Sequence, residues 1–254
     1  MVRLVWLLWL LSLPLGAAPL RIGGTLEPPL RYLDPQGRPA GLDVEVIRTL
    51  LGRMGVDNHI QLVTSSARLM REAKLGHFDM LLTLSKDPSR LALLSYPQQA
   101  HLQIGWYFFV RKEDKARLRF HDYQDLKPWR IGLTQDYVYT PAFLAAVNQP
   151  GFRLQTITQN RLQLPKLLAG HIDIVPLNQI TALAQIQAQG WQDRLDYLTP
   201  PLTRQPYYNP LVLASPYPDK PALLRRYDAE LSQMIQDGSL AALYRRYQLT
   251  EALP

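Results

Sequence analysis

Two stretches of this chain follow the same local pattern, and they constrain its fold more than any other feature. Residues 73–85 read AKLGHFDMLLTLS, and residues 167–179 read LLAGHIDIVPLNQ. Each is the end of a predicted helix, followed by Gly-His, an apolar residue, an Asp and a strand-like run. A glycine that closes a helix before a strand is common in α/β proteins, so these tetrapeptides indicate fold rather than function. Because open α/β sheets bind ligands at the carboxyl ends of their strands, we expect a site just beyond both runs.

Strand and helix patterns alternate on either side of each repeat. Apolar and alternating runs predict strands at residues 20–22, 60–63, 78–82, 104–110, 130–133, 153–157 and 172–175. Helical spacing predicts one helix from Leu42 to a glycine cap at Gly55 and a second that ends just before Gly76. It predicts further helices at 164–168, 221–235 and 240–247. We expect Gly23-Gly24 to end the first strand. This order is an α/β pattern with parallel strands, present twice.

The first residues are typical of a secretory signal peptide and not of the folded protein. Arg3 precedes an apolar run over 4–13, which is followed by Pro14, Gly16, Ala17 and Ala18. The run is too short for a membrane helix, which needs about 20 apolar residues. We therefore expect residues 1–18 to be a signal peptide, and the protein to be exported, without a membrane span after cleavage. In a Gram-negative host it would be periplasmic.

Composition excludes several classes of site. The chain has no cysteine, which rules out disulfides, thiol catalysis and attachment of a lipid to cysteine. Its net charge of +7 comes from scattered basic residues without a nucleic-acid-binding motif, so we expect solvated helix faces and no nucleic-acid partner. The five histidines are scattered, and no hydrolase, metalloprotease or phosphate-loop motif occurs. We expect no metal and no cofactor, with His77 and His171 capping or facing solvent.

Several stretches in order along the chain carry a family resemblance. They are Pro29-Leu30-Arg31-Tyr32-Leu33-Asp34, Leu75-Gly76-His77-Phe78-Asp79, Thr83 to Arg90 with Ser95-Tyr96-Pro97, Arg130-Ile131-Gly132 and Gln236-Asp237-Gly238-Ser239. With them the chain resembles the family 3 periplasmic solute-binding proteins, the type II Venus-flytrap group that serves uptake of polar amino acids. The resemblance implies a two-lobed α/β fold, in which each lobe is a mixed sheet flanked by helices. It implies a lobe one of 19–110 plus 205–254, a lobe two of 111–204, and a hinge of two crossing segments near 104–110 and 203–211.

The resemblance also implies a binding site in the cleft between the lobes. In this family the positions of Thr83, Ser85 and Arg90 hold the α-carboxylate of the ligand. The chemistry fits, because an arginine fork matches a carboxylate in two hydrogen bonds and nearby hydroxyls add others.

Other positions depart from the family pattern. Asn178 stands where amino-acid-binding members have the acidic partner of the ligand ammonium, and an amide cannot neutralise that charge. Glu27 could supply it. Bulky residues, Gln135 and Tyr137 among them, replace a small lobe-two loop, and Thr64-Ser65-Ser66 replaces an apolar or aromatic residue. Tyr32 of the first motif is added to the residues discussed above. The expected ligand-binding residues are therefore Glu27, Tyr32, Thr83, Ser85, Arg90, Gln135, Tyr137 and Asn178.

Three functions remain open at this point. The leading hypothesis is a monomeric exported protein that captures a small, amino-acid-like carboxylate solute, for an inner-membrane ABC permease. The second is a sensory or accessory solute-binding domain that acts by docking another protein. The third is an enzyme that resembles cyclohexadienyl dehydratase, with Glu27 or Asp136 as the acid. Because no catalytic spacing is present, we do not expect an enzyme.

Overall fold

The structure is a computed structural model that describes residues 18–118 and 120–254. The predicted signal peptide therefore lies outside the described residues, apart from Ala18. Within the described part of the chain, no helix is long and apolar enough to cross a membrane.

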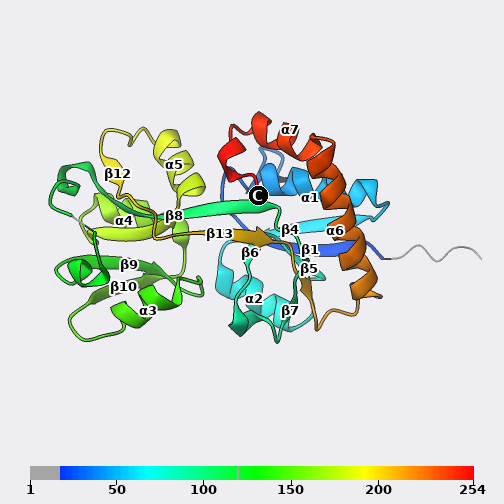
Figure 1. Cartoon of the computed structure of the whole chain (residues 1–254), viewed down its shortest axis with the longest axis horizontal. Helices are drawn as coiled ribbons and strands as arrows, with labels where there is room; N and C mark the ends of the chain where they lie inside the picture. Colours follow the sequence, from blue (N-terminus) through cyan, green and yellow to red (C-terminus); the bar gives the residue numbers. More distant parts are fainter. Residues whose placement is uncertain (1–17, 119) are drawn as a thin grey trace, which may run out of the picture.

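Lobe one, on the right of Figure 1, is built on a five-stranded mixed sheet. Its strands, in order, are β4 (Asn58–Val63), β1 (Leu20–Thr25), β5 (Met80–Leu81), β14 (Leu211–Val212) and β7 (Leu94–Ser95). β1 pairs in parallel with both β4 and β5, as the sequence pattern predicts, and β14 is antiparallel. Its helices are α1 (Leu42–Arg53), α2 (Ser66–Lys74), α6 (Lys220–Gln236) and α7 (Ser239–Arg246). In Figure 1, α1 and α7 lie above this sheet and α2 lies below it.

Lobe two contains the second α/β unit, in which β9 pairs in parallel with β10 and β11. Its strands are β9 (Arg130–Thr134), β10 (Arg153–Ile157), β11 (Ile174–Asn178) and β12 (Leu195–Tyr197). Its helices are α3 (Pro141–Val147), α4 (Gln163–Leu168) and α5 (Gln179–Ala188).

Two long antiparallel strands, β8 (Leu102–Arg111) and β13 (Thr203–Tyr208), run between the lobes (Figure 1). They join β10, β9 and β11 to β6 (Leu84–Ser85) in one continuous sheet. This confirms the predicted α/β fold with a hinge of two crossing segments; the residue boundaries of the lobes stay a prediction. The remaining elements are β2 (Tyr32–Leu33), β3 (Pro39–Ala40) and the 3-10 turns η1 (Pro88–Arg90), η2 (Lys112–Asp114), η3 (Tyr123–Leu126), η4 (Asn160–Leu162) and η5 (Thr250–Ala252).

The two Gly-His-x-Asp stretches occupy matched places. Gly76 after α2 and Gly170 after α4 have φ angles of 72° and 69°, the left-handed conformation that glycine adopts without strain. Both histidines that follow are exposed, as expected, and His77 is hydrogen-bonded to Glu72.

The aspartate of each stretch explains why the pattern recurs. Asp79 accepts hydrogen bonds from the main-chain N of Arg21 (2.7 Å) and from its guanidinium (2.7 and 3.1 Å). Asp173 makes the same three bonds with Arg130, at 2.9, 2.8 and 2.7 Å. Each carboxylate therefore ties the segment before a new strand to the start of the parallel strand beside it.

We expect Asp173→Ala and Asp79→Ala each to lower the free energy of unfolding by about 2–3 kcal/mol, because a buried N–H and an arginine lose their charged acceptor. Burial would raise the pKa of each carboxyl, but hydrogen bonds from Arg130 and Arg111, or from Arg21 and Ser215, outweigh it and lower the pKa. Their contribution is therefore present above the ordinary carboxyl pKa and is lost as the pH falls through the lowered values. Urea titrations from pH 7 to pH 3 measure this. Asp193→Ala, at a fully exposed carboxylate, is the control, and an equal loss there would contradict the assignment.

Several strand boundaries differ from the sequence prediction. β1 continues through Gly23 and Gly24, which do not end it. A Cβ atom on Gly23 would lie 2.7 Å from the Phe78 ring, so the glycine allows close packing inside the strand. β5 is confined to Met80–Leu81, and β11 begins two residues later than predicted and continues to Asn178.

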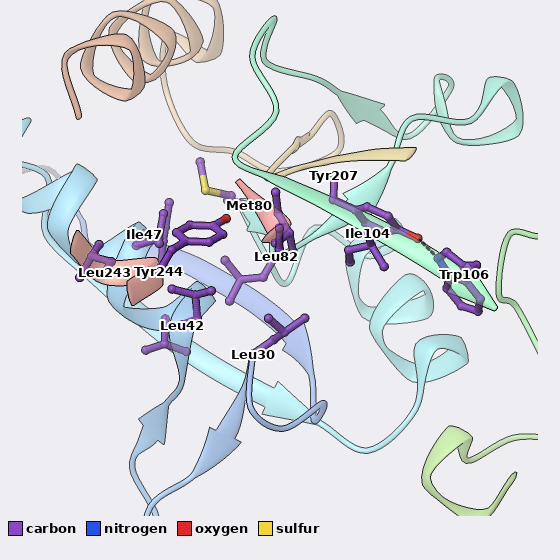
Figure 2. Packing of buried hydrophobic residues seen from close by; sticks show 14 of the residues in the cluster. Leu30, Leu42, Ile47, Met80, Leu82, Ile104, Trp106, Tyr207, Leu243 and Tyr244 are labelled. Carbon is purple, nitrogen blue, oxygen red and sulfur yellow. Dashed lines mark hydrogen bonds between the residues drawn. The ribbon is translucent and has the colours of Figure 1, made fainter. Parts of the chain in front are cut away.

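The core of lobe one lies between its sheet and the helices α1 and α7. Figure 2 shows Tyr244 of α7 packed among Leu42, Ile47 and Leu243, and its side chain is fully buried. Tyr244 therefore belongs to this core. The same cluster continues along β8 to Ile104 and Trp106, so the core of lobe one reaches the hinge strands.

Candidate functional site

A cavity of about 50 Å³ lies between the lobes, at the ends of the strands that the two repeats introduce. Thr83 follows β5 and Asn178 ends β11, and both line it, as the sequence predicts. Six of the eight predicted site residues line this cavity: Glu27, Thr83, Ser85, Arg90, Tyr137 and Asn178. Tyr32 and Gln135 do not. Tyr32 pairs with Ala40 in the β2–β3 hairpin, and Gln135 is exposed.

Arg90 is the clearest feature of the cavity. It ends the 3-10 turn η1, which Asp87 caps by accepting a hydrogen bond from the N of Ser89 at 2.9 Å. The residue is only 9% exposed. Within the described part of the chain, the hydrogen bonds of its guanidinium are all long, at 3.4 and 3.5 Å to Ser85 O and Oγ and at 3.4 Å to Asp136 O.

No carboxylate oxygen within residues 18–118 or 120–254 forms an ion pair with Arg90. A buried guanidinium without a counter-ion is unfavourable, and a carboxylate that binds it in two hydrogen bonds relieves this cost. The cavity therefore has the geometry of an anion-binding site.

Arg31, the other buried arginine of the cavity wall, has partners. Its guanidinium is ion-paired with Asp43 and with Glu27 (3.1 Å), and its Nε donates to Thr25 O at 2.9 Å. Burial would raise the pKa of Asp43, but the charge of Arg31, the nearby His101 ring (3.7 Å) and the hydrogen bond from Thr83 outweigh it and lower the pKa. Arg31 therefore supports the wall of the cavity and is not available to a ligand in the way that Arg90 is.

Thr83 has a different partner from the one that the family resemblance implies. Its hydroxyl donates to Asp43 at 2.6 Å, and its main-chain N donates to Asn209 Oδ1 at 2.9 Å. Because the hydroxyl proton points at a buried carboxylate, it is not available to the carboxylate of a ligand.

Tyr137 closes the cavity from lobe two. Its phenol donates to Glu27 of lobe one, so this hydrogen bond joins the two lobes. Burial, together with the charge of Glu27, raises the pKa of Tyr137 well above its ordinary value, which keeps the phenol protonated as a donor.

An aromatic wall lies beside Tyr137. The rings of Tyr137 and Trp106 meet edge to face, with their centroids 6.0 Å apart. Figure 2 shows the Trp106 indole and the Tyr207 phenol directed at each other, and Trp106 Nε1 donates to Tyr207 Oη at 2.7 Å. Neither residue was predicted from the sequence to belong to the site. Their position was the available signal, since both lie on the segments predicted to cross the hinge.

Asn178 links the cavity to helix α5. It is the N-cap of α5, where its Oδ1 accepts a hydrogen bond from the N of Ile180 at 2.9 Å. The residue is 3% exposed. The helix thus engages the carbonyl oxygen, and the amide NH₂ is the part of this side chain that remains for a ligand.

A larger groove of about 830 Å³ lies on the other side of the hinge strands. Its walls come from α5 and the last residues of the chain, which lie above β8 in Figure 1, whereas α2 and β6 lie below it. The charged side chains that line it belong to Arg204 and Glu251, both at its surface. The groove lacks a buried cation such as Arg90, so we place the candidate binding site in the smaller cavity.

Comparison with known proteins agrees with this geometry. A family model described as bacterial extracellular solute-binding proteins, family 3, matches residues 20–250. No curated protein matches the sequence.

Several solved structures share the fold. A histidine kinase sensor domain with similarity to periplasmic binding proteins has a TM-score of 0.78 and 21% identity, covering 94% of this chain and 98% of its own. An ancestral arginine-binding protein bound to glutamine has a TM-score of 0.76 and 17% identity, with coverage of 91% and 98%. A putative L-cystine ABC transporter from Listeria monocytogenes also has a TM-score of 0.76 and 17% identity, with coverage of 93% and 98%. At these identities the likeness shows the fold alone.

Proposed function

The chain belongs to family 3 of the bacterial extracellular solute-binding proteins, and we propose that it captures a small carboxylate-bearing solute in the cavity between its lobes. The observation that carries the proposal is Arg90, a buried guanidinium in an interlobe cavity without a carboxylate partner among the described residues. A solute carboxylate would be the missing partner.

The position of the cavity supports a mechanism of closure around the solute. Arg90, Ser85 and Glu27 belong to lobe one, and Asp136, Tyr137 and Asn178 belong to lobe two. Rotation about β8 and β13 would separate these two sets and open the cavity to solvent. A solute that touches both sets would stabilise the closed form, because its contacts are complete only there.

We further propose that the protein is exported by the predicted signal peptide and acts as a periplasmic monomer that delivers solute to an inner-membrane ABC permease. The family is described as extracellular, which supports export. The amino-acid-binding and ABC-transporter structures of the same fold support an amino-acid-like solute and a role in uptake.

A sensory or accessory role is the second candidate. It is favoured by the likeness to a sensor domain over 94% of this chain. The same cavity would serve it, with closure read by a docked protein in place of a permease.

The dehydratase-like alternative is less well supported. Glu27 accepts hydrogen bonds from Arg31 and Tyr137, which is the opposite of the donor role that a catalytic acid needs. Asp136 is exposed, where a carboxyl lacks the burial that favours its acid form.

Thermal unfolding of the purified protein with a panel of amino acids and other small carboxylates tests the binding function. A solute at a hundred times its dissociation constant is expected to stabilise the native state by about 2.7 kcal/mol. The matching amides or esters, which lack the carboxylate, are the control and should leave the melting temperature unchanged. A cooperative melting transition that no carboxylate shifts would contradict the proposal.

A further inference from the structure

The hydrogen-bonding groups that line the cavity restrict the class of carboxylate that it can hold. The ammonium of an amino acid carries a positive charge and three donors, so in a buried site it needs acceptors, at least one of them negative. Ser66 and Ser85 offer hydroxyls, which accept hydrogen bonds but do not neutralise charge. The carboxylates that line the cavity belong to Glu27 and Asp136, and these decide whether an ammonium has a partner.

Both carboxylate oxygens of Glu27 already accept hydrogen bonds. Arg31 donates to its Oε2 at 3.1 Å, and the Tyr137 phenol donates to its Oε1. An ammonium would have to displace a phenol that the other lobe holds in place. Asp43, which also pairs with Arg31, is fully buried behind the cavity wall and does not line it.

Asp136 is also a poor partner for an ammonium. It is exposed, so water screens its carboxylate, and its main-chain oxygen already accepts a hydrogen bond from Arg90. The side chain of Asn178 gives its carbonyl oxygen to helix α5 and keeps the donor NH₂ for the cavity.

The groups left for a ligand are thus mainly donors: the fork of Arg90 and the NH₂ of Asn178. From this we infer that the solute is a short 2-oxo or 2-hydroxy carboxylate rather than a 2-amino acid. Its carboxylate would bind Arg90, and its oxo or hydroxyl oxygen would accept from Asn178. This inference rests on the proposed function, since it assigns the substrate class of the same site.

Calorimetric titration with pairs that share one carbon skeleton is the test: pyruvate or lactate against alanine, oxaloacetate or malate against aspartate, and 2-oxoglutarate against glutamate. At least one oxo or hydroxy acid is expected to bind tenfold or more tightly than its amino counterpart. If an amino acid binds as tightly as its counterpart or more so, and Arg90→Ala abolishes that binding, the inference is wrong while the proposed function stands. If neither series binds, both are wrong.

Variants at position 178 test the stated reason for the preference. Asn178→Asp and Asn178→Ser both keep a good N-cap for α5, but only the aspartate adds an acceptor charge. We expect Asn178→Asp to shift the preference towards the amino acid at least tenfold more than Asn178→Ser does, because the serine loses the amide donor but adds no acceptor charge. Equal shifts in the two variants, with both melting like the wild type, would overturn the role assigned to Asn178.

Discussion

Replacing Arg90 with alanine is expected to abolish solute binding without destabilising the unliganded protein. A buried ion pair that loses one partner costs about 2–5 kcal/mol of binding free energy, which raises the dissociation constant by about 30-fold or more. The unliganded protein should be as stable as the wild type or more so, because Arg90 makes only contacts of 3.4–3.5 Å and has no ion pair among the described residues.

Two measurements on the same variant separate a ligand-binding arginine from a structural one. Calorimetry gives the dissociation constant, and urea unfolding without ligand gives the stability. Arg90→Lys keeps the charge but loses the fork, so its affinity should lie between those of the alanine variant and the wild type. Arg38→Ala, at an arginine whose side chain is 71% exposed, is the control. A large loss of stability in Arg90→Ala together with unchanged binding would reverse the assignment.

Replacing Asp43 with asparagine is expected to produce the largest loss of stability, about 3–5 kcal/mol, because it leaves a buried arginine without its main counter-ion. Asp43 is fully buried, is ion-paired with Arg31 and accepts the Thr83 hydroxyl at 2.6 Å. Asparagine has nearly the same shape, so the loss would come from charge and hydrogen bonding rather than from a cavity. Urea unfolding at pH 7 measures it.

Asp34→Asn is the matched control, because Asp34 also pairs with an arginine but at the surface. Its effect should be far smaller, since water screens an exposed pair. The pKa of Asp43 is lowered in the folded protein, so its stabilisation is present above the ordinary carboxyl pKa and is lost as the pH falls through the lowered value. Asp43→Asn should therefore weaken the acid dependence of stability. If both variants lose the same amount, the buried pair is not the support that we describe.

Much of the fold could be predicted because its determinants are local in the sequence. The apolar periodicity of residues 42–53 predicts α1, and the Gly-His-x-Asp stretches predict where helices end and strands follow. The boundaries were less predictable. Gly23 reads as a break, but the ring of Phe78, 55 residues further along the chain, needs the space beside it. A residue pattern within one segment does not contain that contact.

The residues of the candidate site also fall into those that could be predicted from the sequence and those that could not. Arg90, Ser85 and Asn178 could be found because the family resemblance places them at ligand-binding positions, and the structure places them around one cavity. Trp106 and Tyr207 were missed because they come from two hinge strands 101 positions apart, and only their pairing brings them to the cavity wall.

By itself, then, the sequence determined that the chain forms two α/β units, and it identified an arginine able to receive a carboxylate. Only the tertiary structure decided what each polar group of the site is free to do. The proton of Thr83 goes to Asp43, Glu27 is held by Tyr137 from the other lobe, and the oxygen of Asn178 caps α5. Arg90 has no carboxylate partner among the described residues. The physical reason is that each buried donor or acceptor must find a partner in space, and its nearest partner lies on another element of the fold.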